Sequence, residues 1–219
     1  MLLRQCTTCC ATLACGQNDL FFAVSWKLHF TISCLTKIDN EITLYFMAMD
    51  YYNNFTQTNV IHMINPYDSK DYGNGVNYKL DGNKIYLQQT SYSSSTTTSY
   101  YLAKDVDDYY YYQYYNGQWY KSSITEEQYN QNTSNGISAD TRALLFEGSN
   151  YEKNGDVYNY IGDDVYFELQ GDRFVFENIT LTINGDVLTI SFTIASGAIT
   201  GAYTFSNVNT TIVSLPTVA

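Results

Sequence analysis

An aromatic segment around an Asn-Gly pair, YYYYQYYNGQWYK at residues 109–121, constrains the fold more than any other part of the sequence. An Asn-Gly pair between two strand-forming runs is the strongest short-range signal for a two-residue hairpin turn. With this pair in the turn, alternation along the strands gathers four aromatic residues on one face, namely Tyr110, Tyr112, Tyr114 and Trp119. This face suits either a core with ordinary cross-strand aromatic pairs or a wall that meets an amphipathic ligand.

Further turn signals predict that antiparallel hairpins continue along the chain. A turn at residues 82–83 sets opposite charges and apolar pairs against each other, whereas a turn one residue earlier sets two lysines together. A turn at residues 171–172 pairs Leu169 with Phe174. The Ser/Thr run at residues 93–99 is typical of a flexible loop between two strands.

The C-terminal third predicts a meander with one apolar and one threonine-rich face. A turn at residues 185–186 puts every large apolar side chain of this hairpin on one side. A turn at residues 196–197 continues the meander and sets Gly201 opposite Phe192, whose ring covers the missing side chain. The apolar residues of this segment change from even-numbered to odd-numbered positions just before residue 179, which predicts a bulge or corner near residues 177–178.

Helical signals are confined to the middle of the chain. Ser123 or Thr125 followed by two glutamates predicts an N-cap with an acidic first turn, and residues 138–146 predict a second short helix. The remaining elements are about eight to ten antiparallel strands in local hairpins, interrupted by one or two short helices, so the fold class is mainly β. Such a meander must curl around helices, or close into a barrel, to hide its apolar face.

The first part of the chain differs in composition from the rest. All five cysteines precede residue 35, whereas the 23 tyrosines begin at Tyr45. We therefore divide the chain into an atypical leader, residues 1–45, and a single β domain, residues 46–219. Three interpretations of the leader stay open: a zinc site at its clustered cysteines, a lipoprotein leader with Cys15 as the lipidated residue, or a mis-set start. No run reaches the roughly 18 apolar residues that span a membrane.

Charge and motifs exclude several function classes. The formal net charge of −11 argues against a nucleic-acid partner and against electrostatic docking on anionic lipid. His62 has no cysteine or carboxylate at ligand or triad spacing, so we interpret it as structural or exposed. The acidic clusters at residues 105–108 and 163–164 lack the spacing of a calcium loop. We expect no enzymatic activity, no metal site and no cofactor.

The order of segments over residues 50–218 resembles the LolA-like lipoprotein-carrier superfamily, which includes the LppX/LprG-type lipoproteins and related small lipoproteins of Gram-positive bacteria. The matching segments are NNFT at 53–56, YKLDGNKIY at 78–86, the aromatic pair at 109–121, YEKNGDVY at 151–158, YTFSNVN at 203–209 and IVSLP at 212–216. The resemblance implies an extracytoplasmic half-barrel of about eleven strands, with helices on its concave face and a cavity for acyl chains. It also implies lipid anchoring through an N-terminal cysteine, for which Cys15 is the candidate.

Two functions follow as expectations. The first is a non-catalytic cell-envelope protein that carries a lipid or lipidated ligand in an apolar cavity, with acyl chains as its partner and membrane anchoring through an N-terminal lipid. The residues expected to line this cavity, under helices at 124–146, are Tyr110, Tyr112, Tyr114, Trp119, Leu144 and Leu145. The alternative is a surface interaction or scaffold module whose exposed tyrosines bind glycan or protein. Outward tyrosines in that case are Tyr109, Tyr111, Tyr115 and Tyr120.

Overall fold

The computed structural model describes residues 41–132, 137, 139–169 and 172–218, which belong to one compact unit over residues 40–219. The expected leader falls largely outside the described residues, and so does the lipidation candidate Cys15. Residues 41–45, the last part of the expected leader, instead form the start of helix α2 (Glu41–Tyr52).

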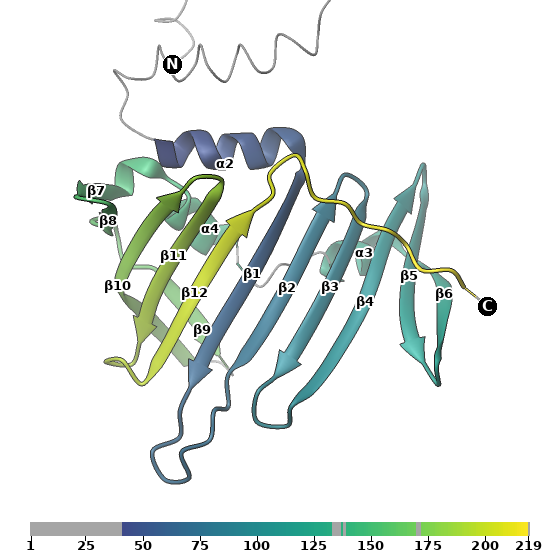
Figure 1. Ribbon diagram of the computed structural model, residues 1–219, viewed down its shortest axis with the longest axis horizontal. Coiled ribbons are helices and arrows are strands. Elements are labelled where there is room, and N and C mark those ends of the chain that lie inside the picture. The colour runs from purple at the N-terminus through teal and green to yellow at the C-terminus, as the bar shows by residue number, and fades with distance from the viewer. Residues whose placement is uncertain (1–40, 133–136, 138, 170–171, 219) are drawn as a thin grey trace, which may run out of the picture. The chain divides into compact units, whose positions relative to one another are not determined.

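The fold is mainly β, as expected (Figure 1). In the described part, eleven antiparallel strands form one sheet in the order β6-β5-β4-β3-β2-β1-β12-β11-β10-β8-β7, and β9 pairs with one end of β10. The strands are β1 (Asn54–Met63), β2 (Asn74–Asp81), β3 (Lys84–Ser91), β4 (Thr96–Asp105), β5 (Asp108–Tyr115), β6 (Gln118–Ile124), β7 (Tyr151–Asn154), β8 (Val157–Tyr160), β9 (Tyr166–Leu169), β10 (Asp172–Asn184), β11 (Val187–Ile194) and β12 (Ile199–Ser206).

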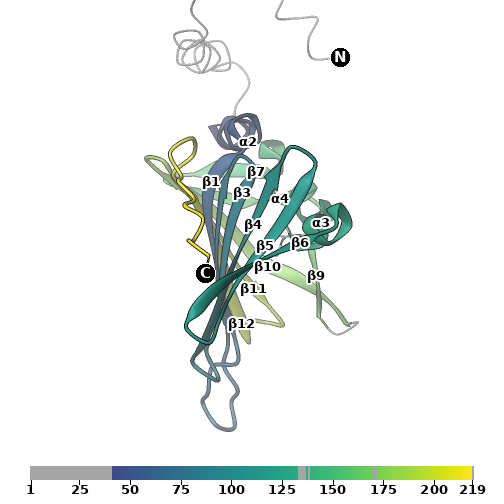
Figure 2. The same cartoon turned by 90° about the vertical axis from the view of Figure 1, so that its right-hand side faces the viewer.

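The sheet stays open. It is neither closed nor strongly curled, so the closed or strongly curled form expected from the sequence is not observed. In Figure 2, α3 (Glu126–Asn132) and α4 (Ala139–Leu145) lie on one side of the sheet, while the C-terminal segment lies on the other. Helices hide the apolar face that would otherwise require closure. The described residues hold three short α-helices rather than one or two, and none of them is long and apolar enough to cross a membrane.

Helix α2 was not expected from the sequence, yet it packs firmly on the sheet. Its side chains Ile42, Phe46 and Met49 follow helical spacing and are buried. The Phe46 ring stacks on that of Phe146 at a centroid distance of 3.8 Å and meets the Phe205 ring edge-on. The Tyr45 hydroxyl lies 2.7 Å from the Asp186 carbonyl and 2.8 Å from the Phe205 carbonyl, and burial raises its pKa to about 12.

Helix α3 begins as the sequence predicts. The Thr125 hydroxyl accepts a hydrogen bond from the Gln128 amide at 3.2 Å, and the Gln128 side chain accepts one from the Thr125 amide at 3.0 Å. This reciprocal pair is a capping box, which satisfies two backbone donors at the helix start. Thr125, rather than Ser123, is therefore the N-cap residue.

Most predicted registers are confirmed. The aromatic hairpin turns at Asn116 and Gly117, both with positive φ, and pairs Tyr114 with Trp119. The turns at 82–83, 185–186 and 196–197 give the predicted pairs. The predicted bulge lies where the register shifts between Glu177 and Thr180.

Two local predictions are wrong. In β9 and β10, Leu169 pairs with Asp172 and Phe167 with Phe174, so Asp172 belongs to the strand rather than to the turn. The run at 93–99 is not all loop, because β4 begins at Thr96 and its threonines pair with β3. Threonine favours strands, and here the partner strand outweighs the loop-like composition.

Candidate functional site

The face of the sheet that is turned away from α3 and α4, hereafter the open face, carries a continuous row of five paired residues. Direct pairing across adjacent strands links Lys79 of β2, Tyr86 of β3, Tyr101 of β4, Tyr112 of β5 and Lys121 of β6. Residues directly opposite each other in antiparallel strands share a face and lie close together. We call these five residues the tyrosine row. It spans four strand spacings, about 19 Å.

Neighbouring side chains establish which way the row points. Leu102 follows Tyr101 in β4 and is fully buried in the core, so Tyr101 points to the opposite side. Tyr111 of β5 packs against the core beside Tyr100, with ring centroids 5.3 Å apart. Tyr112, the next residue, therefore also points away from the core.

Aromatic contacts extend along and beside the row. The ring centroids of Tyr86 and Tyr101 lie 4.9 Å apart, and those of Tyr101 and Trp119 lie 5.1 Å apart at an angle of 72°. Trp119 continues to Tyr114 at 5.3 Å. Such tilted and edge-on pairs fix the rings against each other.

Exposure varies along this cluster. Tyr114 is 56% exposed, whereas Tyr112 is only 6% exposed, and Tyr86, Tyr101 and Trp119 are half-buried. Partial burial, followed by the neighbouring Tyr101, raises the pKa of Tyr86 above its ordinary value. Apart from Tyr112, the cluster therefore presents aromatic ring surface to solvent.

A lysine occupies each end of the row. The Lys121 ammonium lies 3.5 Å from the ring centroid of Tyr110 and 5.8 Å from that of Tyr112. At the other end, the Lys79 ammonium lies 5.8 Å from the ring centroid of Tyr86. Cations over aromatic rings are attracted by the ring quadrupole, and the attraction keeps each ammonium beside the tyrosines.

The structure divides the six residues expected to line one cavity. Four of them, Tyr110, Tyr112, Tyr114 and Trp119, share a face as predicted, but it is the open face. Leu145 is fully buried in the core and Leu144 packs against it, on the helix side. The two groups therefore do not meet. Within 109–121 both faces are aromatic, so alternation alone does not reveal which face the helices cover.

The four tyrosines that the alternative function places outside are also divided. Tyr109 and Tyr111 were expected outside, but they lie on the helix side, where the Tyr109 ring is 5.1 Å from that of Tyr129 in α3. Tyr115 and Tyr120 are exposed, at 64% and 45%.

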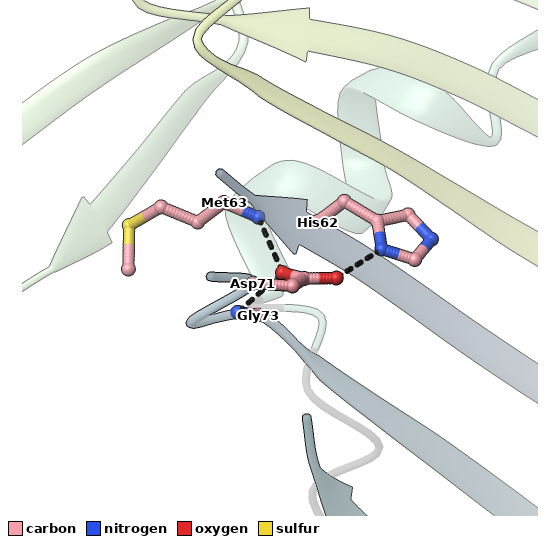
Figure 3. Close-up of polar contacts among 4 residues, drawn as sticks. All are labelled: His62, Met63, Asp71 and Gly73. Carbon is pink, nitrogen blue, oxygen red and sulfur yellow. Dashed lines mark hydrogen bonds and ion pairs between the residues drawn. The ribbon is translucent and has the colours of Figure 1, made fainter. Parts of the chain in front are cut away.

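A second polar cluster lies at the far end of β1 (Figure 3). Asp71 Oδ1 accepts hydrogen bonds from the backbone amides of Met63 (3.0 Å) and Gly73 (2.8 Å), and Asp71 Oδ2 accepts one from His62 Nδ1 (2.6 Å). Partial burial raises the pKa of Asp71, but hydrogen bonds from His62, Gly73 and Met63 outweigh it and hold the pKa below its ordinary value. The His62 ring also stacks on Tyr92 at 5.3 Å. Since the carboxylate closes the loop between β1 and β2, we interpret this cluster as structural.

A shallow hollow of about 560 Å³ lies beside α3 and is lined by Glu126, Glu127, Asn130 and Gln131. Its polar lining does not match an acyl chain. Among the residues with described side chains, no three His, Cys, Asp or Glu groups gather as metal ligands would.

Comparison with known proteins gives no family: no family model matches the chain, and no curated protein matches it. The open face is therefore the basis for a functional argument. Sequence reasoning missed the row as a whole because the Ser/Thr run left the register between β3 and β4 undetermined. The predicted turn at residues 82–83 already sets Lys79 opposite Tyr86. This pairing is the one signal in the sequence from which the first part of the tyrosine row could have been predicted.

Proposed function

We propose that this protein is a non-catalytic module that binds a glycan chain along the tyrosine row. The observation that carries the proposal is the unbroken row of three tyrosines on the sheet face opposite the helices, which the C-terminal segment crosses, with Trp119 and Tyr114 beside the row. Sugar rings have an apolar C–H face that packs on aromatic rings, and their hydroxyl groups hydrogen-bond to tyrosine hydroxyls. Tyrosine offers both surfaces on a rigid side chain that loses little entropy on binding.

The shape of the cluster favours a linear ligand over a protein surface. A standard protein interface buries about 800 Å² on each partner. The tyrosine row is only one side chain wide with a few neighbours, and it extends about 19 Å across the strands. A chain of a few sugar units has these proportions.

The test is a panel of soluble oligosaccharides and polysaccharides in affinity electrophoresis, followed by titration calorimetry on those that bind. Tyr101→Ala removes the central ring, which contacts both Tyr86 and Trp119. We expect it to weaken glycan binding by about tenfold or more, which is about 1.4 kcal/mol. The matched control is Tyr67→Ala, since Tyr67 is 96% exposed in the β1–β2 loop and off the open face. Equal binding by the two variants contradicts the proposal.

A second proposal is the carrier function that the LolA-like resemblance implies, with the finer half-barrel geometry and the cell-envelope location that go with it. The observation that favours it is the single antiparallel sheet with its helices gathered on the apolar face (Figure 2). In this proposal, acyl chains lie between helices and sheet, and each buried CH₂ contributes about 0.8 kcal/mol. Cys15 is the proposed site of lipidation.

Native mass spectrometry of the full chain from a bacterial host tests the carrier proposal. A discrete added mass that extracts into organic solvent as a lipid supports it. A clean protein mass, with no uptake of added fatty acid, contradicts it. Metabolic labelling with a fatty-acid analogue, lost in Cys15→Ser, tests the anchor separately.

A further inference from the structure

We infer that the glycan bound at the tyrosine row is acidic, a carboxylated or sulfated chain whose anionic groups pair with Lys79 and Lys121. This inference rests on the proposed glycan-binding function and adds the class of ligand. Its starting point is the symmetry of the row, in which three tyrosines stand between two lysines across five adjacent strands.

The two lysines stand out against the charge of the chain. The formal net charge is −11, with 11 basic residues against 22 acidic ones. In the described part, the ion pairs join His62 to Asp71, Arg142 to Asp50 and Lys153 to Glu41, and neither row lysine belongs to one. Both ammonium groups are therefore available to an anion from outside.

The carboxylate next along the open face from Lys79 is already engaged. Asp81 is two residues away in β2, and its Oδ1 accepts a hydrogen bond from Asn54 Nδ2 at 3.1 Å. Its Oδ2 accepts one from the Val213 amide at 3.1 Å, which ties the C-terminal segment across this face (Figure 1). The Asp81 carboxylate thus binds the Asn54 side chain and the Val213 amide, and it forms no ion pair with Lys79.

The rings hold the ammonium groups where a ligand would need them. Lys121 is exposed, yet its ammonium lies 3.5 Å from the Tyr110 ring centroid. This contact restricts a side chain that otherwise has high rotamer entropy, so less entropy is lost when an anion binds. A sugar stacked on Trp119, which lies two residues from Lys121 on the same face, brings its carboxylate or sulfate beside that ammonium.

The separation of the lysines selects the kind of acidic glycan. They lie at opposite ends of a row of about 19 Å, so one terminal acidic sugar reaches only one of them. A chain with acidic groups on several units reaches both ends and gains from both pairs. Two lysines in a strongly anionic protein do not provide the clustered cations that nucleic acid requires.

The experiment compares one polysaccharide in two forms, a polyuronate with free carboxylates and the same polyuronate after methyl esterification. Binding to the full chain is measured by titration calorimetry at low and at high salt. We expect wild type to prefer the free acid by about tenfold or more, with the preference falling at high salt. Lys79→Gln with Lys121→Gln should remove the preference, while the control Lys70→Gln, an exposed lysine of the β1–β2 loop, should keep it.

The outcomes separate this inference from the proposed function. Equal binding of both forms, unaffected by the lysine changes but lost in Tyr101→Ala, overturns the acidic ligand and keeps the glycan module. Binding of neither form or of any other glycan overturns both. Binding of an acidic protein in place of glycans also overturns both. Gln retains most of the lysine stem, and thermal unfolding of each variant verifies that the fold is intact.

Discussion

Helix α2 should be an integral part of the domain, and Phe46→Ala tests this directly. Phe46 is 4% exposed, stacks on Phe146 at 3.8 Å and meets the edge of Phe205 at 5.7 Å. Replacing a buried phenylalanine by alanine costs about 3–5 kcal/mol, from lost burial and from the cavity that remains. For a domain of this size each kcal/mol lowers Tm by about 2–4 °C, so we expect a drop of roughly 6–20 °C.

The assay is thermal unfolding followed by circular dichroism, repeated in urea to give a free energy of unfolding. The matched control is Met47→Ala on the same helix, because Met47 is 57% exposed and its loss should stay within about 0.5 kcal/mol. Phe46→Ala combined with Phe146→Ala should cost less than the sum of the two single changes, since both remove the same stacked pair. A Phe46→Ala variant that unfolds at the wild-type temperature would refute the docking of α2.

Three further predictions concern the sheet and its loop. Gly201→Ala should lower the free energy of unfolding by about 1–3 kcal/mol, because an added Cβ would lie 2.4 Å from the Phe192 ring. Gly75→Ala should lower it less, because the added Cβ would meet only the hydroxyl end of the Tyr92 side chain. At the bulge, Asn178 has a φ of +52°, so Asn178→Val should cost about 1–2 kcal/mol in urea unfolding, whereas Asn178→Gly should cost much less. The pKa of Asp71 is lower in the folded protein than its ordinary value of 3.8. The contribution of the Asp71 carboxylate to the free energy of unfolding should therefore be complete at pH values above 3.8 and disappear as the pH falls through the folded-state pKa. The stability difference between wild type and Asp71→Asn should follow that pH course, and a pH-independent difference would contradict it.

The hairpins could be predicted because each register depends on a few neighbouring residues. The turn at Asn116-Gly117 needs positive φ at both positions, and this requirement alone determines the pairing of β5 with β6. The bulge at residues 177–178 could be predicted because the apolar residues change there from even-numbered to odd-numbered positions. Where the turn signal is ambiguous, as at residues 170–172, the predicted register was wrong.

Pairings between distant segments could not be predicted in the same way. β1 lies between β2 and β12, so the two ends of the domain meet in the centre of the sheet, and no local signal encodes this. Helix α2 is apolar on most sides, with neighbours such as Met47 exposed, so its composition did not mark a buried face. The side of the 109–121 hairpin that the helices cover depends on the same long-range packing.

The two halves of the open face differ in a way that stability does not explain. On β1, β12, β11 and β10 the paired residues of one row are threonines, namely Thr58, Thr204, Thr189 and Thr182. The tyrosine row lies two residues along the strands from this one. It carries tyrosines on β3, β4 and β5 and continues to Thr56 on β1 and Ser206 on β12. Threonine and tyrosine pairs both stabilise antiparallel strands, by about 0.2–1 kcal/mol each, so threonine would serve the fold equally well in either half. Exposed aromatic surface also increases the risk of aggregation. The tyrosines between Lys79 and Lys121 are therefore more than strand pairing requires, and this surplus supports the proposal that the row binds a ligand.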